Sequence, residues 1–475
     1  MPGHSWERRV RLAQRHRRYG ERVTIIAFVI GIVVLVVGLA ISIALHELGH
    51  LAPAKSFGVR VGQYMIGFGP TLWSRRRGET EYGVKAIPLG GYISMAGMYP
   101  PGPEDAADTA GAEEQRAAGG APTITATETP ARADRRSARG RFFQTMVQDA
   151  RAVNDETMIG AEDRVFYRLP MWKRIVIMLG GPFMNLVFAM VLFALLFTGI
   201  GVQTATSTVA SLSDCVPAAD GTCQIAETPA AQAGIEPGDR IVSIDGTPVA
   251  DFAEASSLIQ SAPGRTLRVV VERDGSERAL TVTPVPITTS VTDADGEVRE
   301  ERVGFLGIRP TAEFVRQPIW AGPAAAVENV GAVAGVIVQL PVKVADTAAT
   351  LFTGEERDPN GPLSVVGASV LAGEVAASEA PVLNRVAGII GLLGSLNLAL
   401  CVFNLIPLLP LDGGHVVVAL WDGLKRGWAR MLRRPAPKPV DATRLVPVTF
   451  VVVAALGLMG GILILADLVN PISLF

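Results

Sequence analysis

Most apolar residues of this chain are gathered into long runs that carry no charge. Four runs have at least the ~20 residues that a helix needs to cross about 30 Å of hydrocarbon: 23–45, 175–200, 386–411 and 445–466. The 475 residues are 49% hydrophobic, and their net charge is only −2. The pattern predicts a polytopic membrane protein with a core of four transmembrane helices.

Candidate chemistry lies at the end of the first run. The whole chain has five histidines, and His46 and His50 are four residues apart, so a helix places both on one face. Glu47 completes the pattern H-E-x-x-H, in which two histidines bind zinc and the glutamate takes a proton from the attacking water. Ionisable residues at the edge of an uncharged membrane span cost free energy, so they are expected mainly where they have a function. We therefore predict His46 and His50 as zinc ligands and Glu47 as the catalytic residue.

A catalytic zinc needs a third protein ligand, and Asp412 is the best candidate. It is the first charged residue after the 26 uncharged residues of the third run. Taken alone, an aspartate before Gly-Gly is equally compatible with a turn that ends a helix. Together with the histidine pair, the ligand interpretation is favoured.

A fifth segment, residues 321–342, is apolar enough to be a candidate span, although it contains Glu328 and Pro341. If Asp412 is to meet His46, the first and third runs must end on the same side of the membrane. This requires that residues 321–342 do not cross, and we predict an amphipathic helix on the opposite surface.

Several motifs now carry a family resemblance. The chain resembles the bacterial site-2 proteases, which are intramembrane zinc metalloproteases that include the regulator of sigma-E protease. Besides the H-E-x-x-H pattern, the similar motifs lie at residues 67–70, 87–92, 181–185, 361–364 and 404–413.

The resemblance implies one zinc ion per chain, bound by His46, His50 and Asp412. It also implies that Glu47 is general base and acid, and that Asn404 helps to hold the substrate. The expected substrates are single-span membrane proteins such as anti-sigma factors, cut within the lipid bilayer so that a cytoplasmic domain is released.

A transmembrane substrate must be unwound before its amides can be attacked. Residues 59–68 are rich in strand formers and glycine, and we predict a membrane-associated β-hairpin that pairs with an extended substrate. A hairpin that merely covers the site is an equal alternative. Asn185, beside Pro182 in the second run, is a further substrate-binding candidate, for which helix packing is equally compatible.

The insertion between the second and third runs resembles a PDZ domain at residues 229–246, followed by two alternating strands over 267–282 with an Asp-Gly turn. The family implies that it filters substrates by size. Cys215 and Cys223 could form a disulfide on an oxidising outer face, or remain free thiols. Cys401, in the third run, is expected to pack as a small apolar residue.

Lysine and arginine counts predict the orientation. There are 17 in residues 51–174 and 7 in 412–444, against 12 in the longer segment 201–385. The positive-inside rule then places the active site toward the cytoplasm and the PDZ domain outside the plasma membrane. Seven arginines in residues 1–22 disagree with this orientation. No nucleic-acid motif is evident, and the arginines of residues 99–140 are mixed with acids.

The predicted fold is therefore a membrane all-α core of four transmembrane helices with a membrane-associated β-hairpin, plus an inserted mainly-β PDZ domain. We expect an intramembrane zinc metalloendopeptidase. The alternatives are a membrane PDZ scaffold with a structural zinc site, or a membrane-embedded metalloprotease that processes other peptides. The predicted segments are a basic N-terminal segment (1–22), the first span (23–57), the hairpin region (58–98), a disordered linker (99–140) and the second span (141–200). They continue with the PDZ domain (201–290), an extracytoplasmic segment with the amphipathic helix (291–382), the third span (383–415), a cytoplasmic loop (416–444) and the fourth span (445–475).

Overall fold

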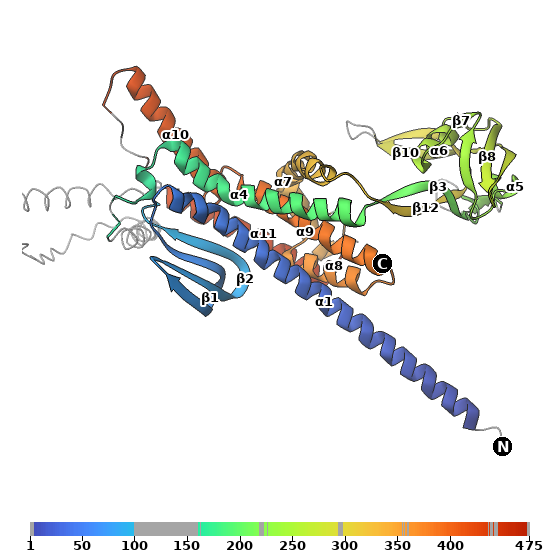
Figure 1. The fold of residues 1–475 in the computed structure, drawn as a ribbon, viewed down its shortest axis with the longest axis horizontal. Helices are drawn as coiled ribbons and strands as arrows, with labels where there is room; N and C mark the ends of the chain where they lie inside the picture. Colours follow the sequence, from blue (N-terminus) through green and yellow to red (C-terminus); the bar gives the residue numbers. More distant parts are fainter. Residues whose placement is uncertain are drawn as a thin grey trace, which may run out of the picture. The chain divides into compact units, whose positions relative to one another are not determined.

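The computed structural model of this chain forms two compact units (Figure 1). One unit contains residues 1–196 and 319–475, and the other contains residues 197–318. The predicted linker at residues 99–140 lies outside the described residues. These are 4–98, 160–161, 163–217, 223–225, 227–292, 298–353, 361–435 and 445–472, with a few single positions between them.

Within the described residues, five helices of the first unit are long and apolar enough to cross a membrane. The predicted number of four spans is therefore not confirmed, because α7, which we expected on the surface, meets the same criteria of length and composition. The first helix is continuous from His4, so much of the predicted basic segment belongs to it. The five are α1 (His4–Ser56), α4 (Met171–Ala194, extended by the π-helix η2, Leu195–Ile200), α7 (Ala321–Thr353), α9 (Val382–Asn404) and α11 (Val446–Val469).

Glycines bring α1 and α4 into direct backbone contact. A Cβ atom on Gly49 would lie 2.1 Å from the carbonyl oxygen of Gly180, and one on Gly180 would lie 2.0 Å from the oxygen of Gly49. Small residues at such a crossing allow close van der Waals packing between helices. The contact is at the residue before His50, so it fixes the second helix against the H-E-x-x-H segment.

The third apolar run does not form one helix. Helix α9 ends at Asn404, and a new helix, α10, begins at Asp412 and continues to Met431. Prolines at 407 and 410 interrupt the run, since proline lacks an amide hydrogen and restricts the residue before it. The prediction that the third span continues to residue 415 with Asp412 at its end was wrong, because Asp412 is the first residue of α10. A shorter helix, α8 (Val365–Ala377), precedes α9.

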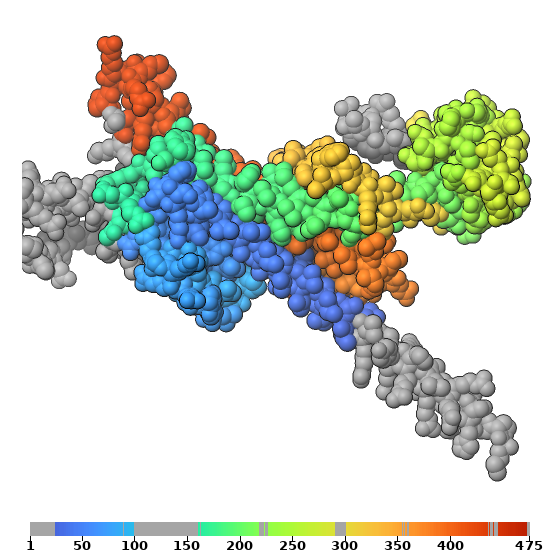
Figure 2. Space-filling model, in the orientation of Figure 1, coloured from blue at the N-terminus to red at the C-terminus, as the bar shows by residue number. Residues whose placement is uncertain are grey.

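The predicted hairpin is confirmed. Its strands are β1 (Val61–Arg77) and β2 (Thr80–Met95), and residues 63–66 pair with 91–94. The hairpin lies against the C-terminal half of α1 (Figure 1, Figure 2). The Tyr64 hydroxyl donates a hydrogen bond to the Ala44 carbonyl oxygen at 2.7 Å, which fixes the sheet two residues before the first histidine.

The second unit is mainly β. Strands β12, β3, β6, β8 and β9 form one sheet in that order, with β7 paired to β6. The core contains apolar side chains of the alternating strands, and Cys215 and Cys223 form a disulfide. Its identification as a PDZ domain stays a prediction. The elements are β3 (Val202–Leu212), β4 (Val216–Pro217), β5 (Cys223–Ile225), α5 (Pro229–Gln232), β6 (Arg240–Ile244), β7 (Thr247–Pro248), α6 (Phe252–Gln260), β8 (Leu267–Arg273), β9 (Ser276–Val282), β10 (Val285–Thr292), β11 (Val298–Phe305) and β12 (Ile308–Val315).

Candidate metal centre and active site

Two elements distant in sequence bring three potential metal ligands together. His46 and His50 lie on the last turns of α1, and Asp412 begins α10. Asp412 Oδ2 is 3.4 Å from His46 Nε2 and 3.3 Å from His50 Nε2, and the two Nε2 atoms are 3.2 Å apart. A tetrahedral zinc site with bonds of about 2.0–2.1 Å separates its ligand atoms by about 3.3 Å. The three atoms therefore fit three corners of a zinc tetrahedron.

The surroundings of Asp412 support a bound cation. Its Oδ2 atom is buried and has no hydrogen-bond partner in the described part of the chain. A buried carboxylate oxygen without a partner is costly. Two imidazole nitrogens that present lone pairs to it would add repulsion, and a divalent cation removes both problems. A zinc ion held here would supply a Lewis acid that polarises the scissile carbonyl and activates water.

Groups behind the histidines orient both rings. His50 Nδ1 donates to the carbonyl oxygen of Ile177 on α4 at 2.8 Å, which leaves Nε2 free as a ligand atom. The side-chain amide of Asn185 is 3.2 Å from His46 Nδ1, and Asn185 is almost fully buried. The Asn185 atom nearest the ring is Nδ2; a flip of the amide, which exchanges its nitrogen and oxygen, would let Oδ1 accept the Nδ1 proton and fix His46 with Nε2 directed at the metal.

Glu47 lies between the two histidines and is buried, with 7% of its surface exposed. The hairpin approaches it closely, because a Cβ atom on Gly91 would lie 2.9 Å from Glu47 Cγ and from Ile43 Cγ2. Only glycine allows strand β2 to lie this near. Glu47 is therefore enclosed between its own helix and the edge of a sheet, where a carboxylate can hold and pass on the proton of an attacking water.

The structure also identifies a residue whose role the sequence did not suggest. A Cβ atom on Gly181 of α4 would lie 2.2 Å from His50 Nε2 and 2.7 Å from His46 Cε1. Any larger residue would therefore occupy the space in which the ligand atoms converge. Gly181 is the first residue of the motif at 181–185 that resembles the family. Its place in that motif was the one sequence feature that could have indicated its role.

Asn404 is not brought against the metal ligands by any contact that the structure describes. Its side-chain amide donates to the carbonyl oxygen of Leu400, one turn earlier in α9, at 3.0 Å. Asn185 does contact the metal centre, because its side-chain amide lies against the His46 ring. Substrate binding by Asn404 and Asn185 stays a prediction.

The fold and the centre together define a class: a metalloenzyme with two metal ligands near the end of a long apolar helix and a third at the first residue of α10. The family model described as "Peptidase family M50" matches residues 34–432. The chain is 33% identical over 470 residues to zinc metalloprotease Rip1 of Mycobacterium tuberculosis, which covers 94% of this chain and 99% of that protein. It is also 28% identical to metalloprotease MmpA of Caulobacter vibrioides, over 84% of this chain and 88% of that protein.

The chain therefore belongs to peptidase family M50. It is a multi-pass membrane protein and a zinc metalloprotease, as predicted. The sequence-based expectations of an enzyme and of a zinc cofactor are confirmed. The alternative of a scaffold with a purely structural zinc is not supported by these relatives.

Proposed function

We propose that this zinc metalloprotease is an intramembrane endopeptidase that cuts transmembrane segments of membrane-anchored regulators, with single-span anti-sigma factors as the expected substrates. The observation that carries the proposal is the convergence of His46 and His50, near the end of the candidate spanning helix α1, with Asp412, which begins α10 shortly after the candidate span α9 ends at Asn404. In this proposal the three residues hold the zinc ion, Glu47 is general base and acid, and the histidines keep the orientation that Ile177 and Asn185 give them.

The position of the hairpin is consistent with a substrate that binds in an extended conformation. Among the described residues, 91–94 pair with 63–66 on one side only, and Gly91 lies against Glu47. A substrate strand added along the other edge would place its amides beside the catalytic carboxylate. Pairing of this kind would also satisfy amides that the substrate loses from its helix. Asn404 and Asn185 are proposed to assist this binding.

The arrangement of helices bears on the membrane topology. The C-terminal end of α1 and the residues that follow α9 meet at the metal centre. This supports our proposal that α7 does not cross the bilayer, since a crossing there would put the two ends on opposite sides. The disulfide in the β unit fits an oxidising compartment. We propose that this unit is an extracytoplasmic PDZ domain that filters substrates by size, and that the active site opens toward the cytoplasm.

The test is cleavage of a trimmed single-span substrate by the full chain in bilayers, compared with Glu47→Gln. We expect zinc to remain at about one per chain and cleavage to fall by about 10²–10⁴-fold, since the proton carrier is lost. Glu328→Gln, an exposed site on α7, is the matched control and should cut normally. If wild type and Glu47→Gln cut equally, or if wild type cuts only soluble peptides, the proposal is wrong.

A further inference from the structure

Helix α10 has two opposite faces with an unusual distribution of residues. One face packs on the N-terminal part of α4, where Gly423 meets Met171 and Asp422 is buried. The other face is apolar but exposed. Its six large residues follow helical spacing and are 46–67% exposed: Val417, Leu420, Trp421, Leu424, Trp428 and Met431. A helix with an exposed apolar face needs an apolar medium or a partner.

Helix α4 indicates the depth of this face in the membrane. The described part of α4 begins its candidate span at Met171, followed by the exposed Trp172 and by Lys173, whose ammonium lies over the Trp172 ring at 5.6 Å. Tryptophan and lysine are enriched where a span reaches the lipid headgroups. Because Gly423 contacts Met171, the middle of α10 lies at that same level. The last turns of α10 extend past the start of α4 (Figure 1).

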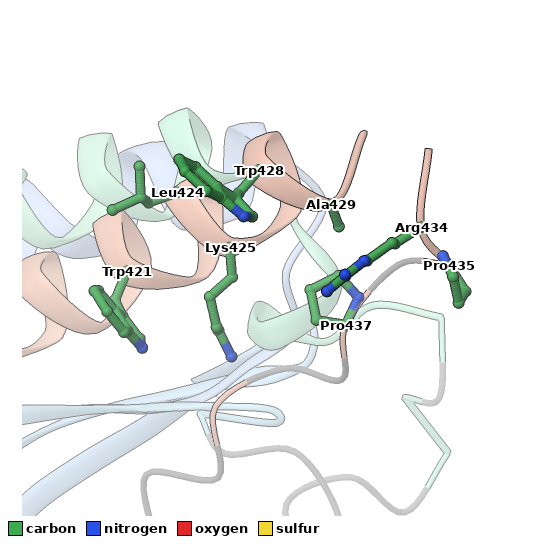
Figure 3. Close-up of a pocket in the computed structure, with 8 residues that line it drawn as sticks. All are labelled: Trp421, Leu424, Lys425, Trp428, Ala429, Arg434, Pro435 and Pro437. Atoms are coloured by element: carbon green, nitrogen blue, oxygen red, sulfur yellow. The ribbon is translucent and has the colours of Figure 1, made fainter. Parts of the chain in front are cut away.

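A cavity of about 490 Å³ lies at this level, beside the apolar face. Trp421, Leu424 and Trp428 line one part of it, and Lys425 and Arg434 bring charge, with two prolines completing the wall. Figure 3 shows the Trp421 and Lys425 side chains extending in the same direction from α10, and the Arg434 side chain turned back toward Lys425. The cavity therefore combines an apolar surface with two cationic groups.

Among the described residues that line the cavity, the charged side chains are cationic. Lys425 is 3.4 Å from Asp422, but that buried carboxylate also accepts from Arg174 at 3.0 Å and from the Val440 amide at 2.9 Å. Among the described residues at this place, one carboxylate faces two cations, and Arg434 adds a third positive charge. The cationic lining of the cavity favours an anionic ligand.

We propose that this cavity binds the phosphate headgroup of an anionic phospholipid, from the leaflet on the side of the metal centre. Lys425 and Arg434 contact the phosphate, and the acyl chains lie along the part of the exposed stripe on the bilayer side of the headgroup level, from Val417 to Trp421. A lipid satisfies both halves of the site at once, since its polar and apolar parts meet at the depth where the cationic and aromatic residues meet. The site is separate from the proteolytic activity, although α10 joins it to Asp412.

The test is native mass spectrometry of the full chain titrated with phosphatidylglycerol and, separately, with phosphatidylcholine. We expect phosphatidylglycerol to bind more tightly, and Lys425→Ala/Arg434→Ala to weaken it by roughly 30-fold, at about a factor of five per basic residue. Binding of phosphatidylcholine should not change. Arg278→Ala/Arg309→Ala, two exposed arginines of the β unit, is the matched control and should bind as wild type.

Other occupants give different results. Equal binding of both lipids, or unchanged binding in the double variant, would overturn the proposal. Displacement of phosphatidylglycerol by millimolar inorganic phosphate would show a free phosphate site, and displacement by a soluble acidic peptide would show a protein site; either result overturns it. Retained zinc reports that each variant is folded. If the double variant loses zinc, Arg434→Ala alone, beyond the end of the helix, serves as the test.

Discussion

The two units treat apolar and polar residues in opposite ways. In the β unit, the large aliphatic side chains form one buried core, and Asp239 is the only buried charged residue among those described. In the unit with the long helices, dozens of large apolar side chains are exposed, whereas Glu47, Arg174, Arg357 and Asp467 are buried. In a membrane, lipid solvates the exposed apolar side chains of such a unit, and its ionisable residues lie in the protein interior, where they pair with one another or bind a metal. A buried carboxylate is therefore an exception in the β unit, whereas in the helical unit it is one of several buried charged groups.

The largest effect is expected for Asp412→Ala. Loss of one of three protein ligands should weaken zinc by more than about 100-fold, because the remaining histidines cannot complete the site. Asp239→Ala removes the buried carboxylate of the β unit and should leave zinc at one per chain. Metal analysis after dialysis against a weak chelator distinguishes the two variants. An Asp412→Ala protein that keeps both zinc and activity would favour a metalloprotease of another design.

The second prediction concerns the ion pair between Arg357 and Asp467, both nearly fully buried. Asp467 also accepts from the amides of Ser364 and Gly367 at the start of α8. Arg357→Ala leaves this carboxylate without a countercharge and should destabilise the unit by about 3–5 kcal/mol. Thermal unfolding in detergent measures the loss. The paired change Arg357→Met/Asp467→Leu should recover part of it, and a Tm unchanged by Arg357→Ala would refute this assignment.

A smaller effect is expected at Asn185, which contacts His46 from behind. Asn185→Ala should weaken zinc by about 10–100-fold, as is typical for groups that orient a ligand. Asn185→Asp, which keeps an acceptor for Nδ1, should restore most of the affinity. Competition with a fluorescent chelator measures both variants. Equal affinity in wild type and Asn185→Ala would show that Asn185 serves helix packing or substrate alone.

These contrasts explain what the sequence could predict. The pair His46 and His50 follows from helical spacing, and Asp412 from its place after a long uncharged run. Both predictions rest on local sequence patterns, which can be recognised without knowing the fold. The β-hairpin and the mainly-β insertion were likewise predictable, since alternation and turn residues are local.

The sequence did not predict the roles of two glycines, because these roles depend on neighbours in space. Gly181 matters only because α4 crosses α1 at the histidines, and Gly91 only because a strand lies against Glu47. Helix α10 lies mostly in the segment 416–444, which we expected to be a cytoplasmic loop, although the helical spacing of its large apolar residues is a local pattern that the sequence contains. Residues 321–342 were predicted to form a surface helix, and this prediction is not confirmed because α7 is long and apolar enough to cross; length and hydropathy alone do not distinguish the two.

The smallest expected effect is the pH dependence of the β unit. Burial raises the pKa of the Asp239 carboxyl, but hydrogen bonds from Arg273 and from the Glu236 amide outweigh it and lower the pKa below its ordinary value. The folded state thus binds fewer protons than the unfolded state, and stability rises with pH. The contribution of Asp239 is complete above the unfolded pKa of about 3.9 and is lost as the pH falls through the lower folded value.

Asp239→Asn should remove this dependence, because an amide does not titrate. We expect the variant to be less stable than wild type at pH 6, and the difference to shrink below about pH 4. Hydrogen exchange of peptides from residues 197–318 in the full chain, corrected for intrinsic rates, measures the opening free energy at each pH. Glu301→Gln, on an exposed stretch of the same unit, is the control. A difference that grows on acidification would mean that the carboxylate of Asp239 is not what joins Arg273 to the Glu236 turn.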